Sequence, residues 1–347
     1  NDVSVGASIA VGIANDTVIA SVERNVSADD GVSVGATSVA RSDTAATASV
    51  AGGQEADDNG DAPAEAGGAP GKSVDEQVAA QGDSAKTKGK ANAAKAPAAP
   101  ETSGGKTGDK LDKSTSDEAP KAETSEGGVS VAAAVGINVA SSETRASIGA
   151  GRSITSTGGA LSVTSTAETD AAAKADGSQT DAGGTNVGIG AAVAVNAATA
   201  TNTAIVSDNA NVNAQGLTVQ AGMDVDAKND FVAEAQSGAG AGKVGVAGSL
   251  AINTVANTTT ALVQGDTDTA GAGFGVGATV NAGTGDILIE AGNASTSTVT
   301  AGAEVQGTGE EAKVGVGASV GVNVVANKTV AEVADKAAIT GGANFGL

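Results

Sequence analysis

The chain has no cysteine, histidine, tryptophan or tyrosine, and only three phenylalanines among its 347 residues. Without cysteine it can form no disulfide bond and carry out no thiol chemistry. Without histidine, cysteine or tyrosine, an active site would have to rely on carboxylates, lysine or arginine. Hydrophobic residues make up 40% of the chain and are mostly alanine and valine. We therefore expect a flat interior that is only one or two side chains across.

Positive charge is also scarce, since 40 acidic residues face 19 basic ones and the net charge is −21. This charge repels phosphate backbones, so we expect no nucleic-acid partner. The sequence has no apolar run of about 18 residues, which predicts no membrane span in this segment. It also begins without methionine or a secretory signal pattern, and we interpret it as a processed or excised piece of a longer protein.

A 20-residue unit occurs five times without a gap. The copy from Val314 reads VGVGASVGVNVVANKTVAEV, and the others begin at Val3, Val129, Val187 and Val244. Two intervals, of 58 and 57 residues, agree, and the other two fit the same period with insertions. Self-similarity at a long period is typical of arrays in which stacked units supply the core. The sequence predicts about five repeats of roughly 57 residues.

Within each unit, apolar and small residues alternate with the two-residue period of a β-strand. One face carries valine and isoleucine, and we expect it to point inward. The other carries glycine, alanine, serine and a recurrent asparagine, and we predict that it is an exposed contact surface, because small side chains allow a second sheet to approach closely. The predicted contact face comprises Gly6, Ser8, Ala10, Ala134, Gly136, Asn138, Gly190, Ala192, Ala194, Asn196, Ala247, Ser249, Asn253, Gly317, Ser319 and Asn323.

The array divides into three parts by composition. Residues 1–53 form the first repeat, and residues 127–347 carry the other repeats, with starts near 129, 187, 244 and 314 and a truncated C-terminal end. Between them, residues 54–126 hold all five prolines and abundant lysine, glutamate and glycine. Such a composition buries too little apolar surface to offset the entropy of ordering. We predict a disordered insertion loop there.

Further short alternating blocks with glycine-containing turns follow each copy, and they favour an all-β parallel β-solenoid. We count five or six short strands per unit, which would make about two coils of three strands. Recurrent asparagines would then lie about 9.6 Å apart, too far for a continuous ladder. The alternative is a stacked antiparallel β-sandwich, in which residues 326–328 turn the long strand back on itself as a hairpin.

Two blocks, ITSTGGALSVTSTA from Ile154 and VNAQGLTVQA from Val212, resemble the repeats of filamentous-haemagglutinin-like and autotransporter-passenger proteins. The 20-residue unit resembles repeats of very large secreted bacterial adhesins and leukotoxin-like proteins. The resemblance covers nearly everything outside residues 54–126. It implies a right-handed parallel β-helix, export across an outer membrane, and structural or adhesive work at the bacterial cell surface. The export domain of these families has no counterpart here.

Candidate chemical sites are few. The acidic residues are scattered, so we predict no catalytic residue and no enzyme; the alternative is a β-helical carbohydrate-active lyase or hydrolase. Loop carboxylates at Asp29, Asp30, Asp266 and Asp268 are candidate Ca²⁺ ligands, against the simpler interpretation as solvated turn residues. No other cofactor is expected. The expected partners are further copies of the chain or laterally packed solenoids, and a cell-surface receptor or glycan.

Overall fold

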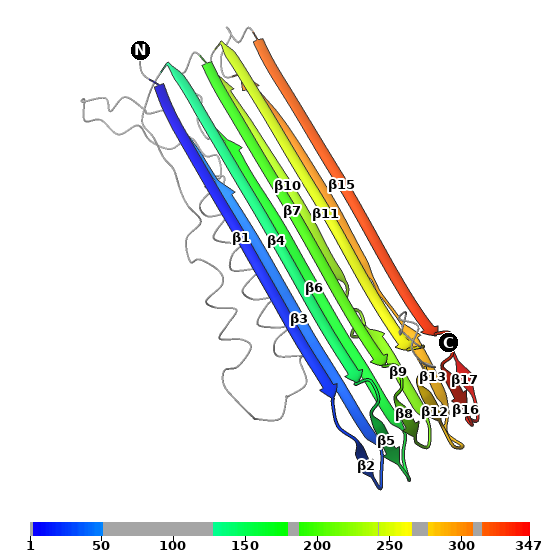
Figure 1. Ribbon diagram of the computed structural model, residues 1–347. Coiled ribbons are helices and arrows are strands. Elements are labelled where there is room, and N and C mark those ends of the chain that lie inside the picture. Colours follow the sequence, from blue (N-terminus) through cyan, green and yellow to red (C-terminus); the bar gives the residue numbers. More distant parts are fainter. Residues whose placement is uncertain (1–2, 51–127, 180–186, 242, 266–276, 308–313) are drawn as a thin grey trace, which may run out of the picture.

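The structure is a computed structural model that describes residues 3–50, 128–179, 187–241, 243–265, 277–307 and 314–347. These residues form an all-β fold in which every paired strand is parallel to its neighbours (Figure 1). The predicted parallel β-solenoid is therefore confirmed, and the antiparallel sandwich is excluded for the described strands. The predicted loop at residues 54–126 lies outside the described residues.

The five copies of the 20-residue unit form one sheet, which we call sheet A. Neighbouring copies pair along their whole length without a shift, so that Val5 lies opposite Val131 and Val131 opposite Ile189. The gapless alignment of the copies is thus the register of the sheet. In spatial order, the strands of sheet A are β1 (Val3–Val22), β4 (Val129–Ile148), β7 (Val187–Val206), β11 (Val244–Val263) and β15 (Val314–Val333).

After sheet A, each coil turns into a short strand of sheet B and then into sheet C. The turn after sheet A places Gly151, Asn209 and Lys336 at equivalent positions in the left-handed region, with φ of 68°, 55° and 66°. Sheet B contains β2 (Val26–Ala28), β5 (Ser153–Ser156), β8 (Asn211–Asn213), β12 (Thr279–Asn281) and β16 (Ala338–Thr340). Sheet C contains β3 (Val32–Thr47), β6 (Leu161–Ser178), β9 (Leu217–Gly222), β10 (Asn229–Ala241), β13 (Ile287–Ala291), β14 (Ser295–Gly307) and β17 (Phe345–Gly346).

Each repeat makes one coil rather than the two that we predicted. The 20-residue unit is a single uninterrupted strand, and residues 326–328, which the antiparallel alternative would make a turn, lie inside β15. That segment lacks glycine and proline, and its neighbour β11 pairs with it in register throughout, so nothing breaks the strand. Consecutive copies are therefore adjacent strands, about 4.8 Å apart.

The interior has a broad region and a thin region. Near sheet B, where three sheets meet, isoleucine, leucine and valine fill a broad core that includes Ile154, Leu161 and Leu217. Farther along, sheets A and C face each other directly; a small cluster with Phe231 and Val255 comes first, and beyond it the buried apolar residues are all alanine, for example Ala134 and Ala192. The interior thus changes from large to small side chains along each long strand.

Candidate functional site

The predicted contact face lies in the interior, so its assignment to the outer surface is wrong. Ser8, Ala134, Ala192, Ala194, Ala247 and Ser249 are all less than 7% exposed, and the bulky residues that alternate with them, such as Ile9, point outward. Sheet C of the same chain covers these small side chains. The face is open only on β15, where Gly317, Ser319 and Asn323 are exposed because no described strand of a further coil covers them.

Close approach of the two sheets explains the small residues. A Cβ atom added to Gly136 of β4 would overlap the carbonyl oxygen of Lys174 in β6, and one added to Gly190 of β7 would overlap that of Gly238 in β10. The backbones of sheets A and C therefore lie nearly in contact at these points, where only glycine fits. Valine and isoleucine have no space on this side of the strand, and they occupy the other side.

The recurrent asparagines form a continuous column inside the thin region. The side-chain nitrogen of Asn138 donates to Oδ1 of Asn196 at 2.9 Å, and that of Asn196 donates to Oδ1 of Asn253 at 2.8 Å. Each nitrogen also donates to sheet C, for example from Asn196 to the carbonyl oxygen of Ala171 at 3.1 Å. Our expectation that no continuous ladder forms is wrong, because one coil per repeat places the asparagines on adjacent strands.

Hydroxyl groups close both ends of this asparagine column. The first copy has Gly12 in place of asparagine, and there Ser42 and Thr44 of β3 donate to Oδ1 of Asn138 at 2.6 and 3.1 Å. At the other end, Asn253 donates to the hydroxyl of Ser297 at 2.8 Å, and this hydroxyl donates to Asn323 at 2.7 Å. The column is therefore saturated with hydrogen bonds, which offsets the cost of burying it.

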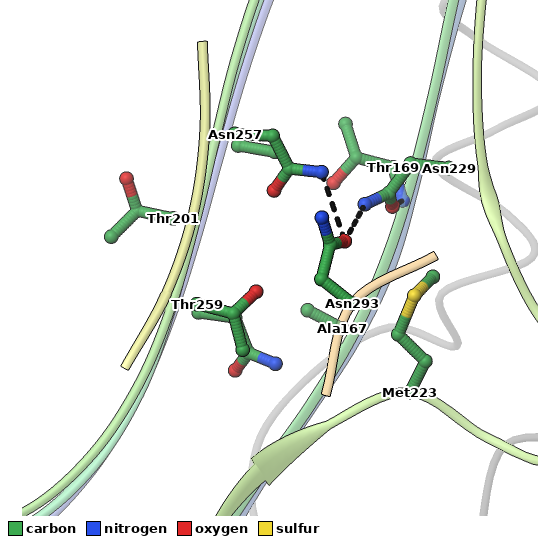
Figure 2. Close-up of a pocket in the computed structure, with 10 residues that line it drawn as sticks. Ala167, Thr169, Thr201, Met223, Asn229, Asn257, Thr259 and Asn293 are labelled. Carbon is green, nitrogen blue, oxygen red and sulfur yellow. Dashed lines mark hydrogen bonds between the residues drawn. The ribbon is translucent and has the colours of Figure 1, made fainter. Parts of the chain in front are cut away.

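A small polar cavity lies between the asparagine column and the broad core (Figure 2). Its volume of about 10 Å³ leaves room for no more than a single water molecule. Asn257 and Asn229 both donate to Oδ1 of Asn293 across it, at 3.0 and 3.2 Å. Asn202 donates to Gly222, whereas its Oδ1 is buried without a partner among the described residues. The cavity has neutral walls and is too small for an organic substrate.

The calcium candidates receive no structural support. Asp29 and Asp30 are exposed in the turn between β2 and β3, where their carbonyl oxygens accept hydrogen bonds from Thr157 and Ser156. Among the described residues, no group of three carboxylate, histidine or cysteine side chains is close enough to hold a metal ion. Asp266 and Asp268 lie outside the described residues.

The outer face of sheet C carries charged residues in register. Arg41 lies 3.8 Å from the carboxylate of Asp170, which accepts a hydrogen bond from the backbone N–H of Asp230 at 2.9 Å. Lys174 of β6 and Glu234 of β10 form a salt bridge at 2.9 Å on the same two strands as Asp170 and Asp230. Burial raises the pKa of Asp170 from 3.8 to about 6, although the hydrogen bond and Arg41 act in the opposite direction. These residues form a polar surface.

The outer face of sheet A is apolar over half of its length. We call this half the outer aliphatic face; it consists of alternate residues of the described segments 5–13, 131–139, 189–197, 246–254 and 316–324. Side chains at its edges are exposed, such as Ile9 at 66% and Val320 at 54%. Beyond it, the same face becomes polar, with Glu143, Thr201 and Lys328 in one row. The sequence did not predict this surface, because we expected its aliphatic residues to point inward.

Comparisons with known proteins give no relative: no family model, no curated protein and no solved structure matches the chain. No helix in the described part of the chain is long and apolar enough to cross a membrane.

Proposed function

We propose that this chain is a structural and adhesive segment of a long bacterial surface protein built as a β-solenoid. The observation that carries the proposal is the unbroken register of five stacked 20-residue strands. Backbone hydrogen bonds join each described coil to the next, and the asparagine column adds side-chain hydrogen bonds in four of the five copies, which makes a stiff stack suited to holding surfaces at a distance from a cell. The resemblance of the repeats to those of secreted adhesins supports the same role.

The shape of the stack adds to this support. A 20-residue strand spans roughly 65 Å at about 3.3 Å per residue, whereas each coil adds only about 4.8 Å to the stack. Each coil therefore presents a wide strip of surface for little height. Large flat surfaces that grow by repetition are suited to binding extended or repeated partners. We place the chain outside the cell, with its outer faces free for contact with a receptor, a glycan or a neighbouring solenoid.

Two experiments test this role. Antibodies against the chain should label intact cells of the source bacterium as strongly as permeabilised cells, and beads coated with the folded protein should adhere to target cells under flow. Beads coated with a Gly190→Ala variant, in which the two sheets cannot approach, provide the control. Labelling only after permeabilisation would rule out the surface location, and equal adhesion of both bead types would rule out a role for the folded solenoid.

The carbohydrate-active enzyme is the alternative to be tested in the same preparation. The protein should be incubated with acidic and neutral polysaccharides, with and without Ca²⁺, while reducing ends and unsaturated products are measured. We expect no product above that of a heat-denatured sample. Polysaccharide cleavage that increases with protein concentration would overturn the non-enzymatic role.

A further inference from the structure

The outer aliphatic face is a chemically uniform surface on an otherwise acidic protein. Each of the five strands contributes five outward residues to it, and among these alternate residues of the described segments Thr254 is the one polar residue and none is charged. The whole chain has a net charge of −21. Apolar patches of several hundred Å² are uncommon on soluble monomers, and larger ones mark interaction sites.

Its size matches a stable protein interface. Five strands about 4.8 Å apart and nine residues of about 3.3 Å each give a rectangle of roughly 24 Å by 30 Å, or about 700 Å². Stable interfaces bury about 600 to 1,000 Å² on each partner. The face is therefore large enough to hold one partner without help from other surfaces.

Its relief is self-complementary. The row Ala7, Ala133, Ala191, Gly248 and Ala318 forms a trough that crosses all five strands between ridges of valine, leucine and isoleucine. A Cβ atom added to Gly248 would meet only the carbonyl oxygen of Ala318, 4.0 Å away, so the trough is open. A ridge of a second identical face fits such a trough, as side chains do between the packed sheets of β-sandwiches.

Charge favours an identical copy over an oppositely charged partner. Two chains of net charge −21 repel each other over most of their surfaces, and the polar rows of sheet C carry several carboxylates. On the outer aliphatic face, contact between two copies brings no charged groups together. A basic partner would gain nothing there, because the face offers no carboxylate.

We propose that the outer aliphatic face of sheet A is a homotypic docking surface, on which the same face of a second copy packs sheet to sheet about a two-fold axis. Such an interface is isologous, so the ridges of each copy contact the trough of the other. This inference rests on the proposed structural role and deepens it by naming the partner and the face. Its test uses purified protein in solution, so its failure leaves cell-surface location and adhesion to cells unaffected.

A matched pair of lysine substitutions tests the interface. Val193 lies on the central strand and central row of the face, whereas Thr203 lies on the same strand and the same side, in the polar half. Val193→Lys and Thr203→Lys both change the net charge from −21 to −20 and thus weaken the overall repulsion equally. Burying a lysine at the centre of an apolar interface is costly, whereas an outward lysine in the monomer stays hydrated.

Sedimentation velocity from about 1 to 100 μM should show a monomer–dimer equilibrium for the wild type. We expect Val193→Lys to raise the dissociation constant at least about 100-fold and Thr203→Lys to change it less than about threefold. Circular dichroism and thermal melts confirm that both variants fold. A wild type that is monomeric at 100 μM, or dimers that survive Val193→Lys unchanged, would overturn the proposal. Flotation of the monomer with phosphatidylcholine vesicles would identify a lipid surface as the occupant instead.

Cross-linking gives a second test with a smaller perturbation. Because the chain has no cysteine, Ala191→Cys and Thr201→Cys each introduce a single thiol on the outer side of β7. A short bismaleimide should join two Ala191→Cys chains, whose troughs lie near the two-fold axis, at least tenfold faster than two Thr201→Cys chains. Equal cross-linking rates for the two variants would contradict the face-to-face arrangement.

Discussion

The broad and thin regions of the solenoid place their large aliphatic residues on opposite sides of the sheet A strands. In the broad region, the interior side chains are Ile154, Leu161 and Leu217, and the outer face of sheet A is polar. In the thin region, the interior side chains are mostly alanine, serine and asparagine, with Phe231 the largest exception among the described residues, and the outer face is aliphatic. The distance between the sheets therefore decides which side of a strand is inside, and hydrophobicity alone does not.

The largest loss of stability is expected from a substitution that forces the two sheets of the thin region apart. In Gly190→Ala, the new methyl group overlaps the carbonyl oxygen of Gly238 and lies 2.9 Å from that of Gly177. We expect a loss of more than about 3 kcal/mol in the free energy of unfolding, because the backbones must separate along a closely packed seam. Gly222→Ala is the control, since no atom lies within 4 Å of its new Cβ. Urea unfolding midpoints that shift equally would show that the sheets are not so close.

The second largest loss of stability is expected in the broad region, where the size of the buried side chain matters more than the distance between the sheets. Leu217 is 1% exposed, and Leu217→Ala should cost about 3 kcal/mol through lost burial and a cavity. Leu250, which forms part of the outer aliphatic face, provides the comparison. Leu250→Ala should cost less than about 1 kcal/mol in the monomer. Thermal unfolding below 1 μM separates the two variants, and the reverse order would invert our assignment of inside and outside.

A smaller loss of stability is expected from substitutions in the asparagine column, where a buried position can be compared with an exposed one. Asn196→Ala leaves Asn138 without one acceptor and Asn253 without one donor, and it removes one hydrogen bond to the carbonyl oxygen of Ala171. Each loss is buried, and we expect a total cost of about 2 kcal/mol. Asn323→Ala, at the exposed last position, should cost about 0.5 kcal/mol or less. Chemical denaturation distinguishes them, and similar costs would mean that burial does not strengthen the column.

The smallest effect is a pH dependence on the outer face of sheet C. Because burial raises the pKa of Asp170 from 3.8 to about 6, its carboxyl binds a proton more tightly in the folded state than in the unfolded one. Its ionisation therefore destabilises the fold above about pH 6, and this penalty disappears as the pH falls toward 4. Asp170→Asn should raise stability at pH 7 by about 1 kcal/mol, with part of the gain lost because Arg41 no longer has this partner.

Unfolding of the wild type and Asp170→Asn between pH 4 and pH 7 measures this dependence. The two curves should converge toward pH 4. Asp43→Asn also removes a carboxylate that pairs with Arg41, but at a more exposed position, and it should change stability by about 0.5 kcal/mol or less. Parallel curves for the wild type and Asp170→Asn would exclude a raised pKa.

Periodicity and the gapless alignment of the five copies were enough to predict the all-β class and the parallel stacking of the copies. The face assignment failed because it applied the usual rule that aliphatic residues point inward. One signal against that rule was present: alternate residues of sheet C, such as Ala171, Ala173 and Ala175, are also small. Two strands with small faces indicate two sheets that pack closely on each other.

The prediction of two coils per repeat was wrong for a related reason. The stretch Ala326-Asn327-Lys328 was interpreted as a turn in the antiparallel alternative, although it contains neither glycine nor proline. Its pairing with β11 keeps it extended, and this tertiary constraint is invisible in one copy of the unit. The charged rows of sheet C were missed for the same reason, because Asp170 and Asp230 are 60 residues apart and lie on adjacent strands only if each repeat makes a single coil.

The asparagine column also restricts how such a protein can grow in evolution. The hydrogen bonds between its asparagine side chains run one way, because the oxygen of Asn196 accepts from Asn138 on the N-terminal side and its nitrogen donates to Asn253 on the C-terminal side. A duplicated middle repeat brings its own donor and acceptor and lengthens the column without leaving a gap. The first repeat, with Gly12, fits only where Ser42 and Thr44 replace the missing amide. We therefore expect duplication of a middle repeat to keep the column continuous, whereas a copy of the repeat with Gly12 inserted between middle repeats would interrupt it.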